Sequence, residues 1–459
     1  MYQIDFNKPE SIHFIGIGGI SMSGLAEILL GAGFTVSGSD NKASALTEHL
    51  EAKGAKIFYG QRAENISETY HCVVYTAAIH PDNPEFARCV ELSLPMLSRA
   101  ELLGQIMKNY PTAIAVSGTH GKTTTTSMFS SVLLAAKCDP TISVGGILDV
   151  IGGNIRVGNS GTFITEACEY TNSFLSFYPT MSIILNIEED HMDFFKDLQD
   201  IRNSFRLFAQ RLPKEGVLII NGEIEDHQEI TEGLTCSVIT YGMDPSCTYY
   251  AENIHFNTQG YGEFDVMHQG TCLGHISLSV PGQHNVSNAL AVIAAARRLD
   301  ISMEQIKDGL LAFHGANRRF QYKGTLNGVT IIDDYAHHPT EIHTTLEAAK
   351  NYPHHEIWCI FQPHTYTRTK AFFHDFAKSL SLADHVILAD IYAARETDTL
   401  GVSSELLSKE ISALGTDCSY FPTFAEIEDF VKSHCVHGDL LITMGAGDVV
   451  NIGESLLSE

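Results

Sequence analysis

Short apolar runs recur along the chain, and stretches with helical spacing of apolar residues separate them. A strand that is buried on both faces of a parallel sheet reads as a nearly continuous apolar run. The segments predicted as strands are 12–15, 34–40, 72–76, 113–116, 163–167, 181–187, 329–334, 357–361, 385–390 and 439–444. Strands that alternate with helices in this way predict an α/β fold.

Two polar breaks divide these segments into three groups. The first break is Lys108-Asn109-Tyr110-Pro111, and the second lies around residues 314–319. Glycine and turn residues around 241–282 predict a small antiparallel insert in the middle group, and residues 286–298 are predicted as a helix. The chain of 459 residues has the length of about three ordinary domains. We therefore predict domains over residues 1–109, 110–316 and 317–459.

The composition is that of a folded and strongly acidic protein. Hydrophobic residues make up 44% of the chain, and the formal net charge is −26 at pH 7. This charge disfavours nucleic acid or a membrane as a partner, although a local positive pocket remains compatible with it. No apolar run approaches the ~18 residues of a membrane span, the N-terminus lacks a signal pattern, and the ten cysteines form no Cys-x-x-Cys pair. We expect reduced thiols and a cytoplasmic location.

The segment 117–126, Ser-Gly-Thr-His-Gly-Lys-Thr-Thr-Thr-Thr, follows a predicted buried strand and precedes a predicted helix that starts near residue 127. Glycines in such a loop let backbone N–H groups approach phosphate oxygens, and the helix N-terminus adds its positive dipole end. Lys122 would supply a charge for the β- and γ-phosphates, and Thr123 a hydroxyl for Mg²⁺. The loop is shorter than the usual P-loop, since Val116 stands where that pattern has its first glycine. The alternative is a glycine turn with a chance lysine.

A second glycine loop, Gly16–Gly24, follows the first predicted strand, and Asp40 ends the second one. This pattern is typical of a βαβ unit that binds a dinucleotide. The same loop suits any nucleotide diphosphate at a helix N-terminus, with Asp40 near a ribose. The residues themselves leave NAD(P) and other nucleotides open.

Polar residues follow several predicted strands, at the edge where α/β sheets place ligands. Glu166-Ala167-Cys168-Glu169 follows one strand, and the segment 186–193, with Asp190 and His191, follows the next. A carboxylate and an imidazole beside a phosphate loop suit Mg²⁺, and the alternative is an exposed acidic loop. In the last group, Asp333–Pro339 and Gln362–Arg368 also end strands, and Arg368 suits carboxylate recognition.

These motifs, in this order, resemble the Mur ligase family over essentially the whole chain. The residues that carry the resemblance are 13–19, 117–124, Asn186-Ile187 with Asp190-His191, His284-Asn285 with Asn288-Ala289, Arg318-Arg319-Phe320, 333–341 and 361–364. The resemblance implies three α/β domains. They are an N-terminal Rossmann-like parallel sheet that binds a UDP-sugar, a central P-loop ATPase-like domain with the antiparallel insert that binds MgATP, and a C-terminal Rossmann-like domain that binds the amino acid.

Within the family, the resemblance is strongest to the enzyme that adds the first amino acid to the peptidoglycan precursor. The implied partners are UDP-N-acetylmuramate, L-alanine and ATP, with Mg²⁺, or Mn²⁺ in its place, as the cofactor ion. The implied reaction forms an acyl phosphate, which the amine of L-alanine attacks. Alternatives are a Mur-type ligase with another amino acid or a peptide as acceptor, an NAD(P)-dependent oxidoreductase, and a nucleotide-gated binding protein. The oligomeric state, monomer or dimer, stays open.

The resemblance also implies roles for individual residues. ATP is expected at Gly118, Thr119, His120, Gly121, Lys122, Thr123, Thr124, Asn285, Asn288, Arg319 and Asp333; the UDP-sugar at Gly16, Gly18, Gly19, Ser23, Asp40 and Thr76; the amino acid at Tyr335, His337 and Arg368; and a metal ion at Thr123, Glu166 and His191. The implied catalytic residues are Lys122, His191, Arg319 and His337. His191 and His337 are alternative acceptors for the amine proton.

The sequence departs from its relatives at three places. Cys168 stands in a segment that many relatives write Glu-Ala-Asp-Glu, which leaves the metal ligand open between Glu166 and Glu169. Arg206 stands about where some relatives carry a carbamylated lysine, so we expect no such modification. Thr365 replaces an arginine, which leaves Arg368 to recognise the amino acid.

Overall fold

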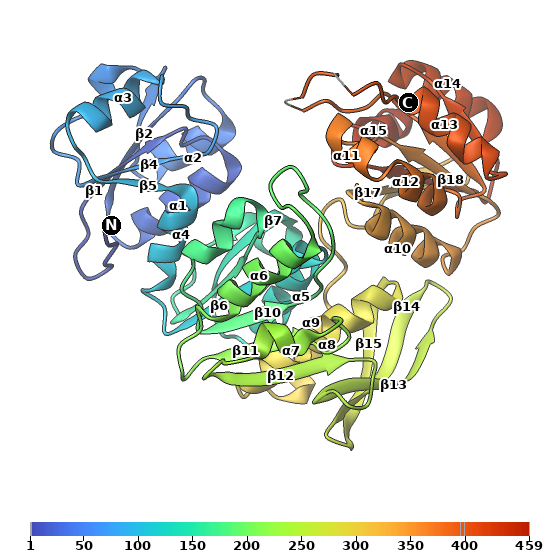
Figure 1. The fold of residues 1–459 in the computed structure, drawn as a ribbon, viewed down its shortest axis with the longest axis horizontal. Helices are drawn as coiled ribbons and strands as arrows, with labels where there is room; N and C mark the ends of the chain where they lie inside the picture. The colour runs from blue at the N-terminus through green and yellow to red at the C-terminus, as the bar shows by residue number, and fades with distance from the viewer. Residues whose placement is uncertain (1, 395, 399, 459) are drawn as a thin grey trace. The chain divides into compact units, whose positions relative to one another are not determined.

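A computed structural model describes residues 2–394, 396–398 and 400–458. These residues form three β-sheets with helices packed against them, as the α/β pattern predicted (Figure 1). The chain divides into two compact units: the first comprises residues 1–126, 133–188 and 198–240, and the second comprises residues 127–132, 189–197 and 241–459. The predicted domain boundaries remain predictions. Both boundaries fall outside the helices and strands. The first lies between the helix that ends at Met107 and the strand that begins at Thr112, and the second lies between the helix that ends at Leu311 and the strand that begins at Gln321.

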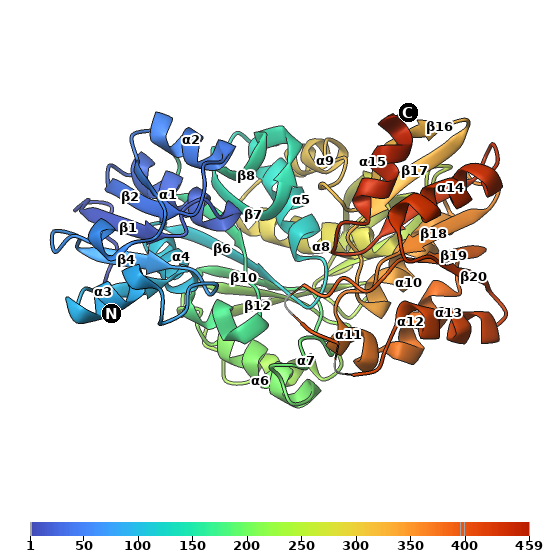
Figure 2. The same cartoon turned by 90° about the horizontal axis from the view of Figure 1, so that it is seen from above.

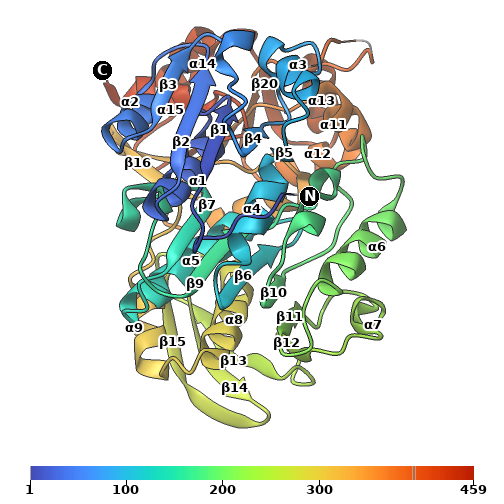
Figure 3. The same ribbon diagram turned by 90° about the vertical axis from the view of Figure 1, so that its left-hand side faces the viewer.

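The N-terminal sheet has five parallel strands in the order β3-β2-β1-β4-β5 (Figure 3). Its strands are β1 (Ser11–Ile15), β2 (Thr35–Asp40), β3 (Lys56–Tyr59), β4 (Cys72–Tyr75) and β5 (Met96–Ser98), and its helices are α1 (Ile20–Gly31), α2 (Ala45–Ala52), α3 (Pro84–Glu91) and α4 (Arg99–Met107). Because all the strands run in one direction, the segments that follow β1, β2, β4 and β5 meet at one edge of the sheet.

The central sheet has ten strands in the order β15-β14-β13-β12-β11-β10-β6-β9-β7-β8. They are β6 (Thr112–Ser117), β7 (Thr141–Leu148), β8 (Gly153–Arg156), β9 (Thr162–Glu166), β10 (Met181–Ile184), β11 (Val217–Asn221), β12 (Ser237–Gly242), β13 (Tyr249–Phe256), β14 (Tyr261–His268) and β15 (Thr271–Pro281). The helices of this region are α5 (Lys122–Ala135), α6 (Leu198–Ala209), α7 (His227–Thr231), α8 (Gln283–Arg298) and α9 (Met303–Leu311). Strands β6, β9, β10 and β11 pair in parallel, which brings the ends of β6, β9 and β10 together.

The predicted antiparallel insert corresponds to β13, β14 and β15, which pair antiparallel. These strands continue the order of the central sheet, because β13 pairs with β12 through Tyr241 and Tyr249. A second antiparallel pair, β7 with β8, was not predicted. Its glycine-rich turn residues weaken the strand pattern there, since glycine has no side chain to mark a buried face.

The C-terminal sheet has six strands in the order β16-β17-β21-β18-β19-β20, parallel except for β16. Figure 2 labels these strands apart from β21. Its strands are β16 (Gln321–Leu326), β17 (Val329–Asp334), β18 (Ile357–Phe361), β19 (His385–Leu388), β20 (Asp417–Tyr420) and β21 (Leu440–Met444), and its helices are α10 (Pro339–Lys350), α11 (Tyr366–Ala371), α12 (Phe373–Leu380), α13 (Ser404–Ala413), α14 (Phe424–His434) and α15 (Val450–Ser458).

Strand β18 shows why the strands of this domain appear in the sequence as continuous apolar runs. Ile357, Cys359 and Phe361 point into a core shared with α10, α12 and α13, whereas Trp358 and Ile360 point into a second core shared with α14 and α15. Successive residues of a strand face opposite sides, and both sides of this sheet are covered. Every residue of β18 is therefore buried.

No helix in the described part of the chain is long and apolar enough to cross a membrane. All ten cysteines are free in this structure.

Candidate active site

The loop between β6 and α5 has the geometry of a phosphate-binding loop. Gly118 and Gly121 adopt φ values of 147° and 82°, which side chains disfavour. A Cβ on Gly118 would lie 2.9 Å from the Cβ of Leu185, so a glycine is required there for space as well. The helix begins at Lys122, five residues before the predicted start, and Thr123 and Thr124 form its first turn. Threonines suit a helix start better than a helix interior, because a hydroxyl at a helix start can reach an exposed N–H group.

Asn186, which follows β10, holds this loop in place. Its side-chain oxygen accepts from the N–H of His120 at 2.7 Å, and its amide donates to the carbonyl of His120 at 3.1 Å. The backbone carbonyl of Asn186 accepts from the N–H of Thr119 at 3.2 Å, and the hydroxyl of Thr119 accepts from the N–H of Glu188 at 2.9 Å. The sequence placed no ligand on Asn186; its structural task is to shape the loop.

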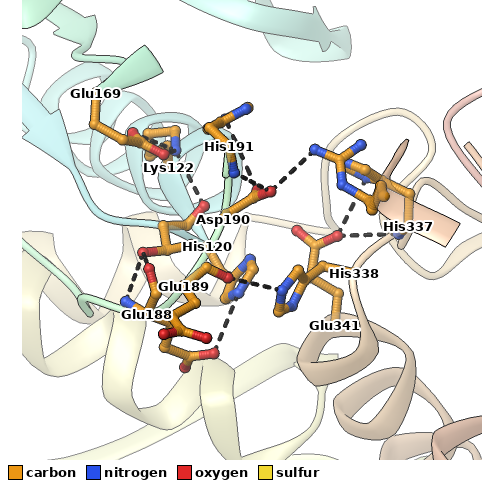
Figure 4. A network of polar contacts seen from close by, with 12 residues as sticks. His120, Lys122, Glu169, Glu188, Glu189, Asp190, His191, His337, His338 and Glu341 are labelled. Atoms are coloured by element: carbon orange, nitrogen blue, oxygen red, sulfur yellow. Dashed lines mark hydrogen bonds and ion pairs between the residues drawn. The ribbon is translucent and has the colours of Figure 1, made fainter. Parts of the chain in front are cut away.

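Lys122 forms a buried ion pair with Glu169 (Figure 4). The ammonium donates to both carboxylate oxygens, at 2.9 and 3.1 Å, and to the carbonyls of Gly118 and Thr119. The Lys122 side chain is 16% exposed, and that of Glu169 only 3%. Burial alone would lower the pKa of Lys122, but the charge of Glu169 outweighs it and the net shift is upward. The lysine is therefore charged at neutral pH.

Thr123 contacts the other carboxylate of this segment, Glu166, at the end of β9. The Thr123 hydroxyl donates to Oε2 of Glu166 at 3.0 Å, and the N–H of Gly145 donates to Oε1. A hydroxyl and a carboxylate oxygen at this separation are the hard oxygen donors that Mg²⁺ prefers. The two acids left open by the sequence thus differ: Glu166 lies beside the threonine and Glu169 beside the lysine.

The N-terminal glycine loop follows β1. The N–H of Gly18 donates to the Asp40 carboxylate at 2.9 Å, and a Cβ on Gly16 would lie 3.3 Å from Cγ2 of Thr76. Gly19 is the N-cap of α1, and the buried Ser23 hydroxyl donates to the carbonyl of Ile20 at 3.0 Å. The predicted UDP-sugar residues therefore gather at one sheet edge. The carboxylate of Asp40, predicted near a ribose, also holds the loop itself.

Asp190 and His191 follow β10 and belong to the second unit. The Asp190 carboxylate accepts from the Arg368 guanidinium at 3.0 Å and from the N–H of His191 at 2.7 Å. Burial raises the pKa of Asp190, but the positive charges of Arg368 and of the nearby histidines lower it by a larger amount, so the net shift is downward. His191 has a φ of 54°, an uncommon conformation for a side-chain-bearing residue. Arg368, predicted to recognise the amino acid, thus already carries one carboxylate partner.

His337 precedes α10 and lies between polar groups. Its Nδ1 is 3.0 Å from the carbonyl of Tyr335 and 3.3 Å from a carboxylate oxygen of Glu341. Two oxygen acceptors at Nδ1 place the proton there and leave Nε2 as the basic nitrogen. Burial lowers the pKa of His337 to about 4, and the charge of Arg368 lowers it too. The imidazole is therefore neutral at neutral pH.

The adjacent Arg318 and Arg319 have different partners. Arg318 donates through Nε to the fully buried Asp333 at 2.9 Å, and Thr443 donates to the other oxygen of that carboxylate at 2.8 Å. Arg319 has a carboxylate oxygen of Glu341 at 3.9 Å. Burial raises the pKa of Asp333 in spite of Arg318. Both guanidinium groups lie 5.1 Å from the ring centre of Tyr335. Asp333, predicted to contact ATP, is thus part of a buried structural pair.

A pocket of about 390 Å³ lies at the start of α8. Its lining residues are Phe256, Gly282, Gln283, His284, His343, Thr344, Glu347, Ala348 and Asn351. The predicted nucleotide residues Asn285 and Asn288 follow directly in the helix and are buried; Asn285 donates to the carbonyl of Pro281 at 2.8 Å, and Asn288 donates to Asn285 at 3.1 Å. Burial lowers the pKa of His284 to about 4, which keeps this wall of the pocket neutral.

Sequence reasoning missed the partners in these pairs. Asn186, Asp190, Arg318 and Glu341 were named only as parts of motifs and received no site role of their own, although each contacts a residue that did. The available signal was their position, since Asn186 and Asp190 stand in the polar segment after β10, Glu341 lies at the start of α10 shortly after β17, and Arg318 lies just before β16. The sequence could not predict which cation pairs with each acid, because the partners lie up to 178 residues apart in the chain.

Comparison with known proteins covers all three sheets. The chain matches the profile of the Mur ligase family, catalytic domain, over residues 11–111, that of the Mur ligase middle domain over residues 116–296, and that of the Mur ligase, glutamate ligase domain over residues 318–447. It is similar to the UDP-N-acetylmuramate–L-alanine ligases of Agathobacter rectalis, 61% identical over 459 residues, and of Lachnospira eligens, 59% identical over 458 residues, with 100% of each chain covered in both cases.

A solved structure agrees with these sequence matches. The UDP-N-acetylmuramate-alanine ligase of Thermotoga maritima is 30% identical, with a TM-score of 0.80 and coverage of 98% of both chains. The murein peptide ligase of Psychrobacter arcticus follows at 26% identity, with a TM-score of 0.68 and the same coverage. The motifs, the three sheets and the full-length likeness agree, and the chain belongs to the Mur ligase family.

Proposed function

We propose that this chain is an ATP-dependent ligase that joins L-alanine to the carboxylate of UDP-N-acetylmuramate in peptidoglycan precursor synthesis. The observation that carries the proposal is the full-length likeness to ligases of that name, at 61% and 59% identity. The same likeness speaks against the oxidoreductase alternative for the Gly16–Gly24 loop, because the whole chain follows a ligase family.

The β6–α5 loop and Lys122 are proposed to bind the phosphates of ATP. A carboxylate that attacks a γ-phosphate brings two anions together, so the reaction needs positive charge and fixed positions. The buried, charged ammonium of Lys122 supplies the positive charge. The hydrogen bonds between Asn186 and His120 fix the position of the loop. Asn285 and Asn288, beside the pocket at the start of α8, are proposed to serve the nucleotide.

Thr123 and Glu166 are proposed to hold Mg²⁺, with His191 as a further ligand. The 3.0 Å contact between the Thr123 hydroxyl and Glu166 supports this choice over Glu169. When bound, the ion neutralises charge on the phosphates and the reacting carboxylate. Glu169 is left to orient Lys122. Mn²⁺ prefers the same oxygen donors and would take the same position.

The C-terminal domain is proposed to present L-alanine through Tyr335, His337 and Arg368. The neutral imidazole of His337 keeps Nε2 as a proton acceptor, which supports it over His191 as the group that takes the amine proton. Arg319, whose guanidinium lies 3.9 Å from a carboxylate oxygen of Glu341, is proposed to reach the ATP phosphates. The N-terminal residues Gly16, Gly18 and Gly19 are proposed to bind the UDP pyrophosphate.

The test is a phosphate-release assay with single acceptors. With ATP, Mg²⁺ and UDP-N-acetylmuramate present, L-alanine should support turnover well above glycine, L-serine and every other amino acid. Reactions without the sugar nucleotide or without an acceptor are the controls, and they should release almost no phosphate. The product should carry one added alanyl residue by mass spectrometry.

A peptide acceptor tests the nearest alternative, a ligase that attaches a whole peptide. Turnover with a peptide but not with L-alanine would replace the proposed acceptor. Phosphate release that does not require the sugar nucleotide would contradict the ligase reaction itself.

Glu166→Gln and Glu169→Gln should affect different steps. The first removes a charged oxygen ligand, so the Mg²⁺ concentration for half-maximal activity should rise roughly tenfold or more. The second removes the carboxylate beside Lys122 and should leave the Mg²⁺ requirement within about twofold of the original. Activity titrated with Mg²⁺, and separately with Mn²⁺, measures both. A raised Mg²⁺ requirement in Glu169→Gln alone would move the ligand from Glu166 to Glu169.

A further inference from the structure

The starting edge of the C-terminal sheet carries histidine and carboxylate side chains, which we call the strand-start cluster. Its members are His355 and Glu356 just before β18, His385 at the start of β19, Asp417 at the start of β20 and Asp439 just before β21. Because β18, β19, β20 and β21 run parallel, their first residues meet at one edge of the sheet. This edge lies opposite the strand ends that carry the proposed amino-acid residues, so the ligase reaction makes no use of the cluster.

Asp439 is a buried carboxylate whose orientation is fixed. Its side chain is only 1% exposed, and Oδ2 accepts from the indole N–H of Trp358 at 3.1 Å and from the N–H of Val436 at 2.8 Å. Oδ1 lies 2.8 Å from Nδ1 of His355, whose side chain is 60% exposed. Ligating carboxylates in metal sites are commonly held by such hydrogen bonds. Asp439 therefore presents one fixed oxygen to an imidazole that is free to adjust.

His385 is held in an arrangement that metal-binding histidines share. Its Nδ1 lies 2.7 Å from the Asp417 carboxylate, and its ring stacks on Trp358 with the ring centres 3.9 Å apart. A carboxylate at Nδ1 places the proton there and leaves Nε2 as the ligand nitrogen. That Nε2 is 3.1 Å from Oε2 of Glu356, and two acceptors at this distance repel each other unless a proton or a metal ion lies between them. Ligand atoms around a tetrahedral Zn²⁺ ion lie roughly 3.3 Å apart, which is close to this separation.

The donor atoms of the strand-start cluster are close together and face no other cation. One ligand atom each from His355, Glu356 and Asp439 lies within 4.8 Å of the others. His385 adds a second imidazole beside Glu356. Among residues 2–394, 396–398 and 400–458, no lysine or arginine pairs with the carboxylates of the cluster, whose ionisable partners are the two histidines. Two imidazoles with two carboxylates are a donor set typical of Zn²⁺, whereas Mg²⁺ and Ca²⁺ prefer oxygen ligands alone.

We propose that the strand-start cluster binds Zn²⁺ through His355, Glu356, His385 and Asp439, with Asp417 orienting His385. The ion connects the starts of β18, β19 and β21, so it stabilises the C-terminal domain and takes no part in the ligase chemistry. Asp439 and His385 supply the fixed ligands, and the more exposed His355 and Glu356 close around the ion. This inference goes beyond the proposed function and does not depend on it.

The experiment is calorimetric titration of the metal-free, full-length protein, without a histidine tag, with ZnCl₂ in excess MgCl₂. The original protein should bind Zn²⁺ at micromolar concentrations or below. His355→Asn and Glu356→Gln each remove a ligand and should weaken the tightest Zn²⁺ binding by roughly 100-fold or more, whereas Asp417→Asn removes only the group behind His385 and should weaken it by about 10-fold or more. With Co²⁺ in place of Zn²⁺, the visible absorption of a tetrahedral site should appear in the original and be lost in His355→Asn.

Three control variants test whether the ion binds elsewhere. His374→Asn removes an exposed histidine that pairs with Glu410, and His255→Asn removes one that pairs with Glu263 on the antiparallel insert. Glu166→Gln alters the proposed Mg²⁺ site. All three should bind Zn²⁺ as the original does. Weakened binding in His255→Asn or in Glu166→Gln, with His355→Asn unchanged, would place the ion at that other site and overturn the proposal.

Thermal unfolding separates metal binding from folding. In EDTA, His355→Asn and Glu356→Gln should unfold at the temperature of the original, because both side chains are exposed at the sheet edge. Added Zn²⁺ should raise the unfolding temperature of the original and of His374→Asn, because it binds the folded state, and should leave that of His355→Asn unchanged. An original protein that binds no Zn²⁺ at micromolar concentrations, or an equal Zn²⁺ effect on His355→Asn, would overturn the proposal and leave the proposed ligase function untouched.

Discussion

Replacing Lys122 with alanine should lower the rate of phosphate release by roughly 10²- to 10³-fold or more, while UDP-N-acetylmuramate still binds. The reason is that a charge aimed at developing negative charge in a dry site contributes several kcal/mol to the transition state. Lys122 is buried, charged and held in the phosphate loop, whereas the proposed UDP-sugar residues lie on the N-terminal sheet. Steady-state phosphate release and calorimetric binding of the sugar nucleotide measure the two halves of this prediction.

The ion pair with Glu169 makes a single variant ambiguous. Lys122→Ala leaves the Glu169 carboxylate, 3% exposed, without its cation, and removing one partner of a buried pair costs about 3–5 kcal/mol of stability. The double variant Lys122→Ala/Glu169→Gln removes both charges, so it should recover most of the lost stability but none of the activity. A double variant that regains near-normal phosphate release would show that the single variant failed through folding, and Lys122 would lose its catalytic role.

Arg318→Met should mainly lower stability and Arg319→Met should mainly lower activity, although the two residues are neighbours. Arg318→Met leaves the fully buried Asp333 without its cation and should destabilise the C-terminal domain by about 3–5 kcal/mol. Arg319→Met loses a 3.9 Å contact with Glu341 and a 5.1 Å approach to the Tyr335 ring, and it should change stability by only about 1 kcal/mol. Its kcat/KM for ATP should nevertheless fall roughly 10²-fold, as expected for a lost phosphate contact.

Hydrogen exchange in β17 and β21 reports the stability of the C-terminal sheet directly, and ATP-dependent phosphate release reports the chemistry. The control is Arg318→Met/Asp333→Asn, which removes both charges of the buried pair and should slow the exchange again. Equal exchange rates in the two single variants would contradict the assignment of the buried pair to Arg318. Full activity in Arg319→Met would remove that residue from the ATP site.

Apolar runs were sufficient to locate most elements of the fold. Residues 357–361 were predicted as a buried strand and form β18 over the same residues, because both faces of the C-terminal sheet are covered. The start of α5 was predicted five residues too late, since β-branched threonines read as poor helix formers. The low helix propensity of threonine does not decide the start of α5, because the fold of the surrounding domain begins the helix at Lys122. The β7–β8 pair, rich in glycine, gave too weak a pattern to predict.

The candidate site was predicted in outline, but its pairings were not. The sequence left the metal ligand open between Glu166 and Glu169, and the structure separates them by their partners, Thr123 and Lys122. It offered Arg318 and Arg319 as one motif, and only Arg318 meets Asp333.

By itself, then, the sequence determined the α/β class, the order of the motifs and the family that they indicate. These follow from local patterns, since apolar spacing and short glycine loops are written in consecutive residues. Only the tertiary structure decided which acid neutralises which cation. Such pairings depend on distances of about 3 Å between strand ends that are far apart in sequence, and a shift of one residue or one rotamer would redistribute them.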